Sequence, residues 1–248
     1  MERRKLNNSD PVLSLVVPVF NEEANVADII QRTNEVMKSL DLTYEIILVN
    51  DGSLDNTLKN AAKYSKTNGF TRIVSYGQNI GKGFALRTGF SNSRGKYVVF
   101  IDGDMEVNPS QIGRYVKALD AGDLVIASKR HPNSRVSAPL LRRFLSLGFN
   151  WLVRFCTGLR LSDTQSGLKA VRRQPLQDVF SVLLVKRFAF DVELLVVANL
   201  QGLRIVELPI EIELTRSTFK VKEILRMLLD LLSISYRLRV LRYYQHLL

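Results

Sequence analysis

The sequence predicts an α/β fold in which a mostly parallel central sheet is flanked by helices. Short apolar runs alternate with longer amphipathic segments through the first half of the 248 residues, an order typical of parallel sheets with helices on both faces. Polar clusters follow several of the apolar runs. The contents of hydrophobic residues (46%) and charged residues (24%) are ordinary for a folded protein. We therefore expect a single domain, 1–248.

The elements of the first half follow from periodicity. Compact apolar runs predict strands, and apolar residues spaced three or four positions apart predict helices. The strands are expected at 12–17, 44–49, 72–75, 97–101 and 124–127. The helices are expected at 22–40, with Ala24 on its inner face, at 54–65 and at 83–93, and Pro109 is suited to open a fourth.

The second half has longer helical patterns and weaker strand patterns. A short strand or extended loop is expected at 167–171 and a strand at 204–213. The C-terminal region is predicted to be basic and amphipathic, because the last helix has its polar residues on one stripe: Lys222, Arg226, Asp230, Ser233 and Arg237. The helices are expected at 140–155, ended by Gly158, at 188–200 and at 221–244.

The net charge of +11 lies entirely in the second half. Residues 1–127 contain 15 basic and 15 acidic side chains, whereas residues 128–248 contain 20 basic and 9 acidic ones. A one-sided basic surface suits an anionic partner such as a phosphorylated substrate, an anionic lipid or a nucleic acid. A basic surface that only contacts water would have the same composition.

Other features of the composition exclude some classes of protein. A single cysteine, Cys156, excludes an internal disulfide, and with only two histidines a structural zinc site is not expected. The polar N-terminus does not resemble a signal peptide, and no run of about twenty apolar residues predicts a membrane span. We expect a cytoplasmic protein that reaches the cytoplasmic face of a membrane peripherally or through an anchoring protein partner.

Two acids, Asp102 and Asp104, stand on either side of Gly103 directly after the apolar run 97–101. Carboxylates at the end of a buried strand are costly unless a positive charge binds them. Magnesium commonly takes one or two carboxylates plus substrate phosphates. Ligands of parallel sheets bind beyond the carboxyl ends of the strands. This turn is therefore predicted to bind a metal and a phosphorylated ligand.

Two further turns have both a structural and a functional explanation. The turn at 51–53 follows the second predicted strand, but Asp-Gly-Ser is also a common turn sequence. Lys82 stands between two glycines before a helix, where a lysine and backbone amides suit a phosphate. This segment lacks the Ser or Thr of a Walker loop.

Several motifs, in their order along the chain, resemble those of family 2 glycosyltransferases with the GT-A fold. In the first half these are 17–22 (VPVFNE), 49–53 (VNDGS), 79–83 (NIGKG) and 102–104 (DGD). In the second half the motifs resemble the dolichyl-phosphate hexosyltransferases, which include dolichyl-phosphate mannose synthase and dolichyl-phosphate glucosyltransferase. These are 128–130 (SKR), 163–170 (DTQSGLKA) and 187–194 (RFAFDVEL). The resemblance covers nearly the whole chain and is closest to the glucosyltransferases.

The resemblance implies a nucleotide-sugar site in residues 1–127. Glu22 and Asp51 are expected to hold the base and ribose. Asp102 and Asp104 are expected to position Mg²⁺ or Mn²⁺ on the diphosphate, with Glu106 as a further metal ligand. The full set implied for the nucleotide sugar is Pro18, Glu22, Asp51, Lys82, Asp102, Gly103 and Asp104.

The resemblance also implies an acceptor site and a membrane-facing surface in residues 128–248. Asp104, Arg130 and Asp163 are expected to be catalytic. In the mannose synthases a C-terminal loop closes over the diphosphate. The corresponding segment here, which contains Arg216 and Lys220, is shorter and lacks the glycine. The set implied for the acceptor is Ser128, Arg130, Arg142, Gln165, Arg216 and Lys220.

The implied reaction is transfer of a hexose, with inversion, from UDP-glucose or GDP-mannose to a polyprenyl or dolichyl phosphate. A phosphate oxygen is already anionic at neutral pH, so it needs cations rather than a strong general base. One alternative is a glycosyltransferase with a saccharide hydroxyl as acceptor and Asp163 as the base. Another is a non-catalytic anion-binding module. Four acids at the ligand edge argue against that module, and no nucleic-acid partner is expected.

Two helices of the second half are candidates for membrane contact. The segment 140–155 mixes arginines with Phe144, Leu147, Phe149 and Trp151, as interfacial helices do. An ordinary core helix has a similar composition, and the leucine-rich face of the C-terminal helix suits packing on the sheet equally well. We predict interfacial contact by at least one of the two.

Overall fold

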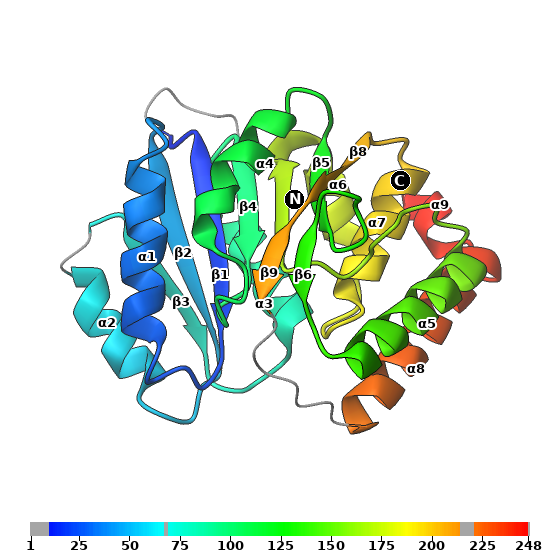
Figure 1. The fold of residues 1–248 in the computed structure, drawn as a ribbon, viewed down its shortest axis with the longest axis horizontal. Helices are drawn as coiled ribbons and strands as arrows, with labels where there is room; N and C mark the ends of the chain where they lie inside the picture. The colour runs from blue at the N-terminus through cyan, green and yellow to red at the C-terminus, as the bar shows by residue number, and fades with distance from the viewer. Residues whose placement is uncertain (1–9, 67–68, 214–220, 248) are drawn as a thin grey trace.

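Seven strands form one twisted sheet through the middle of the described part of the protein (Figure 1). The structure is a computed structural model, and it describes residues 10–66, 69–213 and 221–247. In spatial order the strands are β3 (Thr71–Tyr76), β2 (Tyr44–Asp51), β1 (Leu13–Val19), β4 (Tyr97–Ile101), β7 (Leu168–Arg172), β5 (Leu124–Ser128) and β8 (Ile205–Pro209).

The sheet is parallel except at one strand. β1 pairs in parallel with β2 and β4, β2 with β3, and β5 with β8. β7 runs antiparallel to both of its neighbours, β4 and β5. The predicted mostly parallel sheet is confirmed. Beside it, β6 (Arg135–Ser137) and β9 (Glu211–Glu213) form a small parallel pair.

Each face of the sheet packs against its own helices, because successive side chains of a strand point to opposite faces. Leu15 and Ile46 belong to one core and their neighbours Val16 and Ile47 to the other. The first core packs against α1 (Val26–Lys38), α2 (Thr57–Lys66) and α4 (Ile112–Ala118), the last preceded by the 3-10 turn η1 (Pro109–Gln111). The second packs against α3 (Lys82–Asn92), α5 (Leu140–Thr157), α6 (Arg173–Val182), α7 (Phe190–Leu200), α8 (Val221–Arg239) and α9 (Tyr243–Leu247).

Helix α1 begins at Val26, not at Glu22 as predicted, and Ala24 is exposed rather than on the inner face. Asn21 adopts a left-handed conformation (φ 54°) and is hydrogen-bonded to the loop after β2. The amide of Glu22 donates to Oγ1 of Thr57 at 2.7 Å. These contacts fix residues 21–25 as a turn between β1 and α1, so the helix starts one turn later.

Two segments that were predicted to be continuous are divided. The segment 204–213 forms β8 and β9, which separate at Ile210. The amide of Ile210 donates to Oγ of Ser134, and its carbonyl accepts from the amide of Arg135, the first residue of β6. The segment 221–244 forms α8 and α9, and Arg242 adopts a left-handed conformation (φ 48°) in the turn between them. The pattern also failed to predict α6, which follows β7 without a loop, and the three-residue β6.

Helix α5 has the predicted end. Gly158 adopts a left-handed conformation (φ 76°) and its amide donates to the carbonyl of Arg154 at 2.8 Å, which closes the last turn. None of the helices in the described ranges is long and apolar enough to cross a membrane.

Candidate functional site

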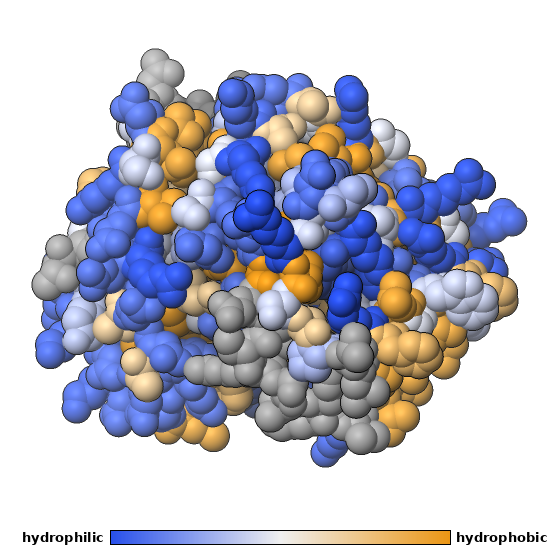
Figure 2. Space-filling model, viewed as in Figure 1, coloured by the Kyte–Doolittle hydropathy of each residue, from blue (hydrophilic) through white to orange (hydrophobic). Residues whose placement is uncertain are grey.

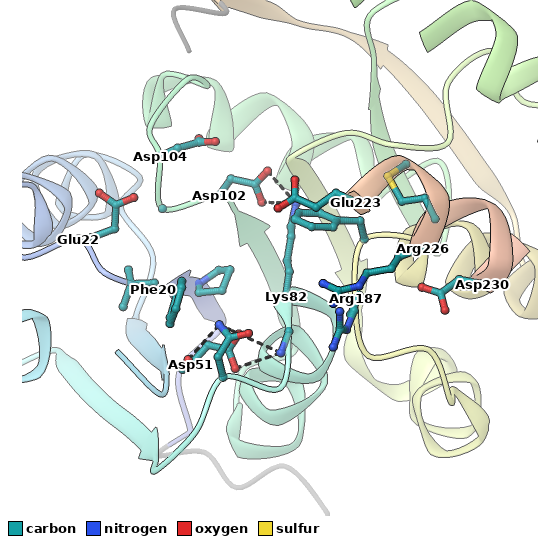
Figure 3. Close-up of a pocket in the computed structure, with 17 residues that line it drawn as sticks. Phe20, Glu22, Asp51, Lys82, Asp102, Asp104, Arg187, Glu223, Arg226 and Asp230 are labelled. Carbon is teal, nitrogen blue, oxygen red and sulfur yellow. Dashed lines mark hydrogen bonds and ion pairs between the residues drawn. The ribbon is translucent and has the colours of Figure 1, made fainter. Parts of the chain in front are cut away.

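A cavity of about 470 Å³ opens at the carboxyl ends of β1, β2 and β4 (Figure 3). The parallel strands bring segments that are far apart in sequence to this one edge. All seven residues predicted for the nucleotide sugar line the cavity: Pro18, Glu22, Asp51, Lys82, Asp102, Gly103 and Asp104. Their contact with a ligand stays a prediction.

The acidic turn after β4 is tightly constrained. Met105 adopts a left-handed conformation (φ 55°), and its amide donates to the carbonyl of Asp102 at 3.3 Å. A Cβ atom on Gly103 would come within 2.5 Å of the carbonyl oxygen of Pro18, so only glycine fits between this turn and β1. Backbone strain of this kind concentrates at functional sites, where the surrounding structure maintains it.

Lys82, the first residue of α3, extends toward this turn (Figure 3). Its Nζ lies 2.7 Å from Oδ1 and 2.8 Å from Oδ2 of Asp102. Burial by itself lowers the pKa of Lys82, but the negative charges of Asp102, Asp191 and Asp104 outweigh it and raise the pKa above its ordinary value. Lys82 is therefore charged and neutralises Asp102.

Asp104 is not neutralised in the same way. Burial, and then the negative charge of Asp102, raise the pKa of Asp104 to about 6. A hydrogen bond from the amide of Glu106 at 3.1 Å opposes this rise only in part. The turn therefore carries excess negative charge, and such a site favours binding of a further cation.

Asp51 fixes the loop that precedes Lys82. Its carboxylate is buried (4% exposed) and accepts hydrogen bonds from the amides of Ile80 at 2.9 Å and Gly81 at 3.0 Å, and from Nδ2 of Asn79 at 3.0 Å. Gly81 has a φ of 125°, a conformation that suits glycine alone. Asp51 thereby sets the position at which α3 presents Lys82.

The second half of the chain supplies another wall of the cavity, which the sequence did not predict. Arg187 and Phe188 precede α7, and Glu223, Arg226, Met227 and Asp230 lie on α8. Both arginine side chains extend toward the cavity (Figure 3), and neither forms a salt bridge with another residue that the structure describes. Arg187 is the first residue of the motif 187–194, and Arg226 belongs to the polar stripe of the last helix. The sequence therefore contained a weak indication that each belongs to a site.

Asp163 lies in a separate cluster that does not line the cavity. It is 2% exposed, and its Oδ2 accepts a hydrogen bond from the amide of Lys129 at 3.0 Å. It also forms ion pairs with Nζ of Lys129 at 3.2 Å and Nη1 of Arg130 at 3.5 Å. The amide of Gln165 donates to Oδ1 of Asp163 at 3.0 Å. Asp163 is thus surrounded by donors.

Arg130 fastens α5 to the sheet. It donates to the carbonyl of Ser162 at 2.8 Å and to the carbonyl of Ser146, within α5, at 2.7 Å. Buried Ser128 contacts Oγ of Ser162 at 2.5 Å. The structure therefore brings Ser128, Arg130, Asp163 and Gln165 together, but outside the cavity lining.

Gly167 connects this cluster with the acidic turn. A Cβ atom on Gly167 would lie 2.5 Å from Oδ2 of Asp102, so the loop before β7 packs directly against that carboxylate. Two residues further on, buried Lys169 forms an ion pair at 3.0 Å with buried Asp191 of α7. This pair was not predicted.

The remaining predicted residues lie either outside the described part of the structure or outside the cavity lining. Arg216, Lys220 and the side chain of Arg142 lie outside the described residues, and Glu106 does not line the cavity. Within the described ranges, no three His, Cys, Asp or Glu side chains are placed to hold a metal ion together. Asp102 pairs with Lys82 here, and the predicted binding of a metal by Asp102, Asp104 and Glu106 stays a prediction.

Comparison with known proteins assigns the family. The model of glycosyl transferase family 2 matches residues 14–180. The chain belongs to this family. It is 32% identical over 241 residues to dolichyl-phosphate beta-glucosyltransferase ALG5A of Trichomonas vaginalis, a match that covers 92% of this chain and 74% of that protein. It is 33% identical over 239 residues to dodecaprenyl-phosphate galacturonate synthase of Rhizobium johnstonii, covering 93% and 70%.

The fold agrees with the family assignment. Glucosyl-3-phosphoglycerate synthase from Mycobacterium tuberculosis, solved with UDP, superposes with a TM-score of 0.68 at 21% identity, covering 95% of this chain and 86% of that one. The predicted resemblance and the predicted GT-A architecture are both confirmed. The chain is a family 2 glycosyltransferase and not the non-catalytic module considered as an alternative.

Proposed function

We propose that this glycosyltransferase moves a hexose, with inversion, from a nucleoside diphosphate sugar to the phosphate of a polyprenyl lipid. The names of both relatives contain a polyprenyl phosphate, dolichyl in one and dodecaprenyl in the other, which supports the acceptor. Their sugars differ. UDP-glucose is the donor that we propose, because several relatives are glucosyltransferases, and GDP-mannose is the alternative from the sequence.

We propose that one half of the chain binds the donor and the other half binds the acceptor. Residues 1–127 contribute the acidic turn and Lys82, which suit a donor diphosphate with its cation. Residues 128–248 contribute Arg187 and Arg226, which suit an acceptor phosphate. Glu223 and Asp230 lie on the same wall, so the proposal rests on the two guanidinium groups and not on a net positive charge of that wall.

Asp102 and Asp104 fit a divalent cation. Lys82 pairs with Asp102, while burial and then the negative charge of Asp102 raise the pKa of Asp104 to about 6. Hard cations such as Mg²⁺ prefer carboxylates together with substrate phosphate oxygens. Bound there, the cation would stabilise negative charge on the leaving diphosphate. Glucosyl-3-phosphoglycerate synthase was crystallised with Mn²⁺ and UDP-glucose, which supports Mg²⁺ or Mn²⁺ as the cofactor.

The burial of Asp163 is the observation that carries the choice of acceptor. A base for a saccharide hydroxyl must be within hydrogen-bond reach of that hydroxyl. Asp163 is 2% exposed, is paired with Lys129 and Arg130, and lies outside the cavity lining. An anionic phosphate acceptor requires no such base. We propose that Arg187 and Arg226 hold this phosphate, and that Arg130 and Ser128 support the acceptor side by anchoring α5.

A polyprenyl phosphate is a membrane lipid, so we propose that the enzyme works at the cytoplasmic face of a membrane. It would reach that face peripherally or through an anchoring protein partner. None of the described helices could span a membrane, and both routes are compatible with that finding.

The proposal is tested with purified protein, Mg²⁺ and polyprenyl phosphate in detergent. Radiolabelled UDP-glucose, GDP-mannose and UDP-galacturonate are supplied separately, and label is measured in the organic phase. We expect lipid-linked label from UDP-glucose. Polyprenol without the phosphate is the matched control and should accept none. Transfer to a saccharide acceptor with no transfer to polyprenyl phosphate would contradict the proposal.

A further inference from the structure

Helices α5 and α8 each expose a continuous apolar stripe, and we call the two stripes together the α5–α8 face. Nine large apolar side chains on it are between 54% and 73% exposed. Their spacing of three or four positions keeps each stripe on one side of its helix. They are Phe144, Leu147, Trp151 and Phe155 on α5, and Leu225, Leu229, Leu232, Tyr236 and Val240 at α8 and its C-terminal end.

The two stripes are neighbours. Oγ of Ser235 in α8 donates to the carbonyl of Cys156 in α5 at 3.0 Å, and Nη2 of Arg239 donates to the carbonyl of Phe155 at 2.7 Å. Figure 1 shows the helices side by side at one end of the molecule, and Figure 2 shows apolar side chains gathered over α5 at that end. The stripes therefore make a single surface.

Leu231 and Ile234 of α8 are buried in the core, but this packing leaves a second apolar side of α8 uncovered. Its polar residues Arg226 and Asp230 face the cavity, while Leu229 and Leu232 on the other side face outward. An ordinary surface helix has one apolar side, which packs on the core, and polar residues on the opposite side. Contiguous exposed apolar patches on soluble proteins mark surfaces that bind another apolar surface.

The charges around the α5–α8 face identify that surface. Over its 18 residues, α5 contains no acidic residue. Exposed basic side chains border the stripes: Arg143, Arg154, Arg160, Lys222, Arg239 and Arg242. An apolar stripe bordered by arginine and lysine, with aromatic residues within it, suits the interface of a bilayer that contains anionic lipids.

We propose that the α5–α8 face inserts into the headgroup region of an anionic membrane and holds the cavity beside it. This inference rests on the proposed function and deepens it by naming the surface that meets the membrane. α8 separates the face from the cavity and is about 10 Å thick. A lipid phosphate at the membrane surface is therefore within one helix diameter of Arg226.

Sedimentation with vesicles tests the inference without any donor or acceptor lipid. We expect the protein to bind vesicles of phosphatidylcholine with phosphatidylglycerol, more weakly at high salt, and to bind phosphatidylcholine alone poorly. Trp151→Glu and Leu229→Glu, one on each helix, should each weaken binding at least tenfold, since each removes a buried apolar side chain from the bilayer. The matched control is Leu58→Glu on α2, an exposed leucine at the opposite end of the molecule.

The outcomes separate this inference from the proposed function. Both face variants should keep transfer to a short, water-soluble prenyl phosphate and lose transfer to acceptor embedded in vesicles. No vesicle binding by the unaltered protein, or equal binding by both variants, overturns the inference. A dimer in solution that Trp151→Glu separates, without vesicle binding, also overturns it. Vesicle binding without sugar transfer to any prenyl phosphate contradicts the proposed function alone.

Discussion

Lys82 contacts both carboxylate oxygens of Asp102, at 2.7 and 2.8 Å. The pair joins the start of α3 to the end of β4, and Asp51 holds the loop on the other side of Lys82. Lys82 thus neutralises Asp102, and the turn keeps the negative charge of Asp104. In the proposed reaction this arrangement presents a fixed cation beside a site that recruits a second one.

Replacement of Lys82 should impair turnover more than folding. Lys82→Met removes a positive charge that is aimed at the proposed position of the diphosphate, and removing one such preorganised group typically costs about 10²–10³-fold in rate. Lys82→Arg, which keeps the charge, is the control and should retain more activity. Steady-state kinetics with the sugar nucleotide measure kcat/KM. An unchanged kcat/KM for Lys82→Met would refute this role.

Neutralising Asp104 should stop the reaction and leave the protein folded. Asp104→Asn keeps the shape of the side chain but removes a ligand of the proposed cation, and we expect a loss of about 10²-fold or more. Because the raised pKa means that the fold disfavours the ionised carboxylate at neutral pH, Tm should not fall. Treatment with EDTA should have the same effect on activity, reversed by Mg²⁺. Full turnover after EDTA would exclude the metal role.

The position of the acidic turn could be predicted from the sequence because it depends on neighbouring residues alone. Residues 97–101 form β4 with the predicted bounds, and Asp102 follows directly. Periodicity also grouped Arg226 and Asp230 on one side of the last helix. Periodicity could not show whether the polar stripe or the leucine-rich side of this helix faces solvent. That depends on the cavity wall that α8 forms with Arg187. The antiparallel direction of β7 depends on contacts across the sheet and has no local signal.

Asp230 should make the stability of the protein depend on pH. Burial, partly offset by the charges of Arg187 and Arg237, raises the pKa of Asp230. The folded state therefore binds this proton more tightly than the unfolded state does, and stability is lost as the pH rises through the folded pKa. Asp230→Asn should raise Tm at pH about 7, with a gain that shrinks toward pH about 4. Thermal melts across this range measure the difference. A gain that grows at lower pH would contradict the assignment.

Asp163→Asn distinguishes a positioning role from a catalytic base. The substitution breaks the buried ion pairs with Lys129 and Arg130, and removing one partner of such a pair costs about 3–5 kcal/mol in the free energy of unfolding. We expect a lower Tm and, per folded molecule, less than about tenfold loss of transfer to polyprenyl phosphate, whereas loss of a general base costs about 10²–10⁴-fold. Asp120→Asn, at an exposed turn, is the control and should change neither quantity. A normal Tm with abolished turnover would instead make Asp163 the base and favour a hydroxyl acceptor.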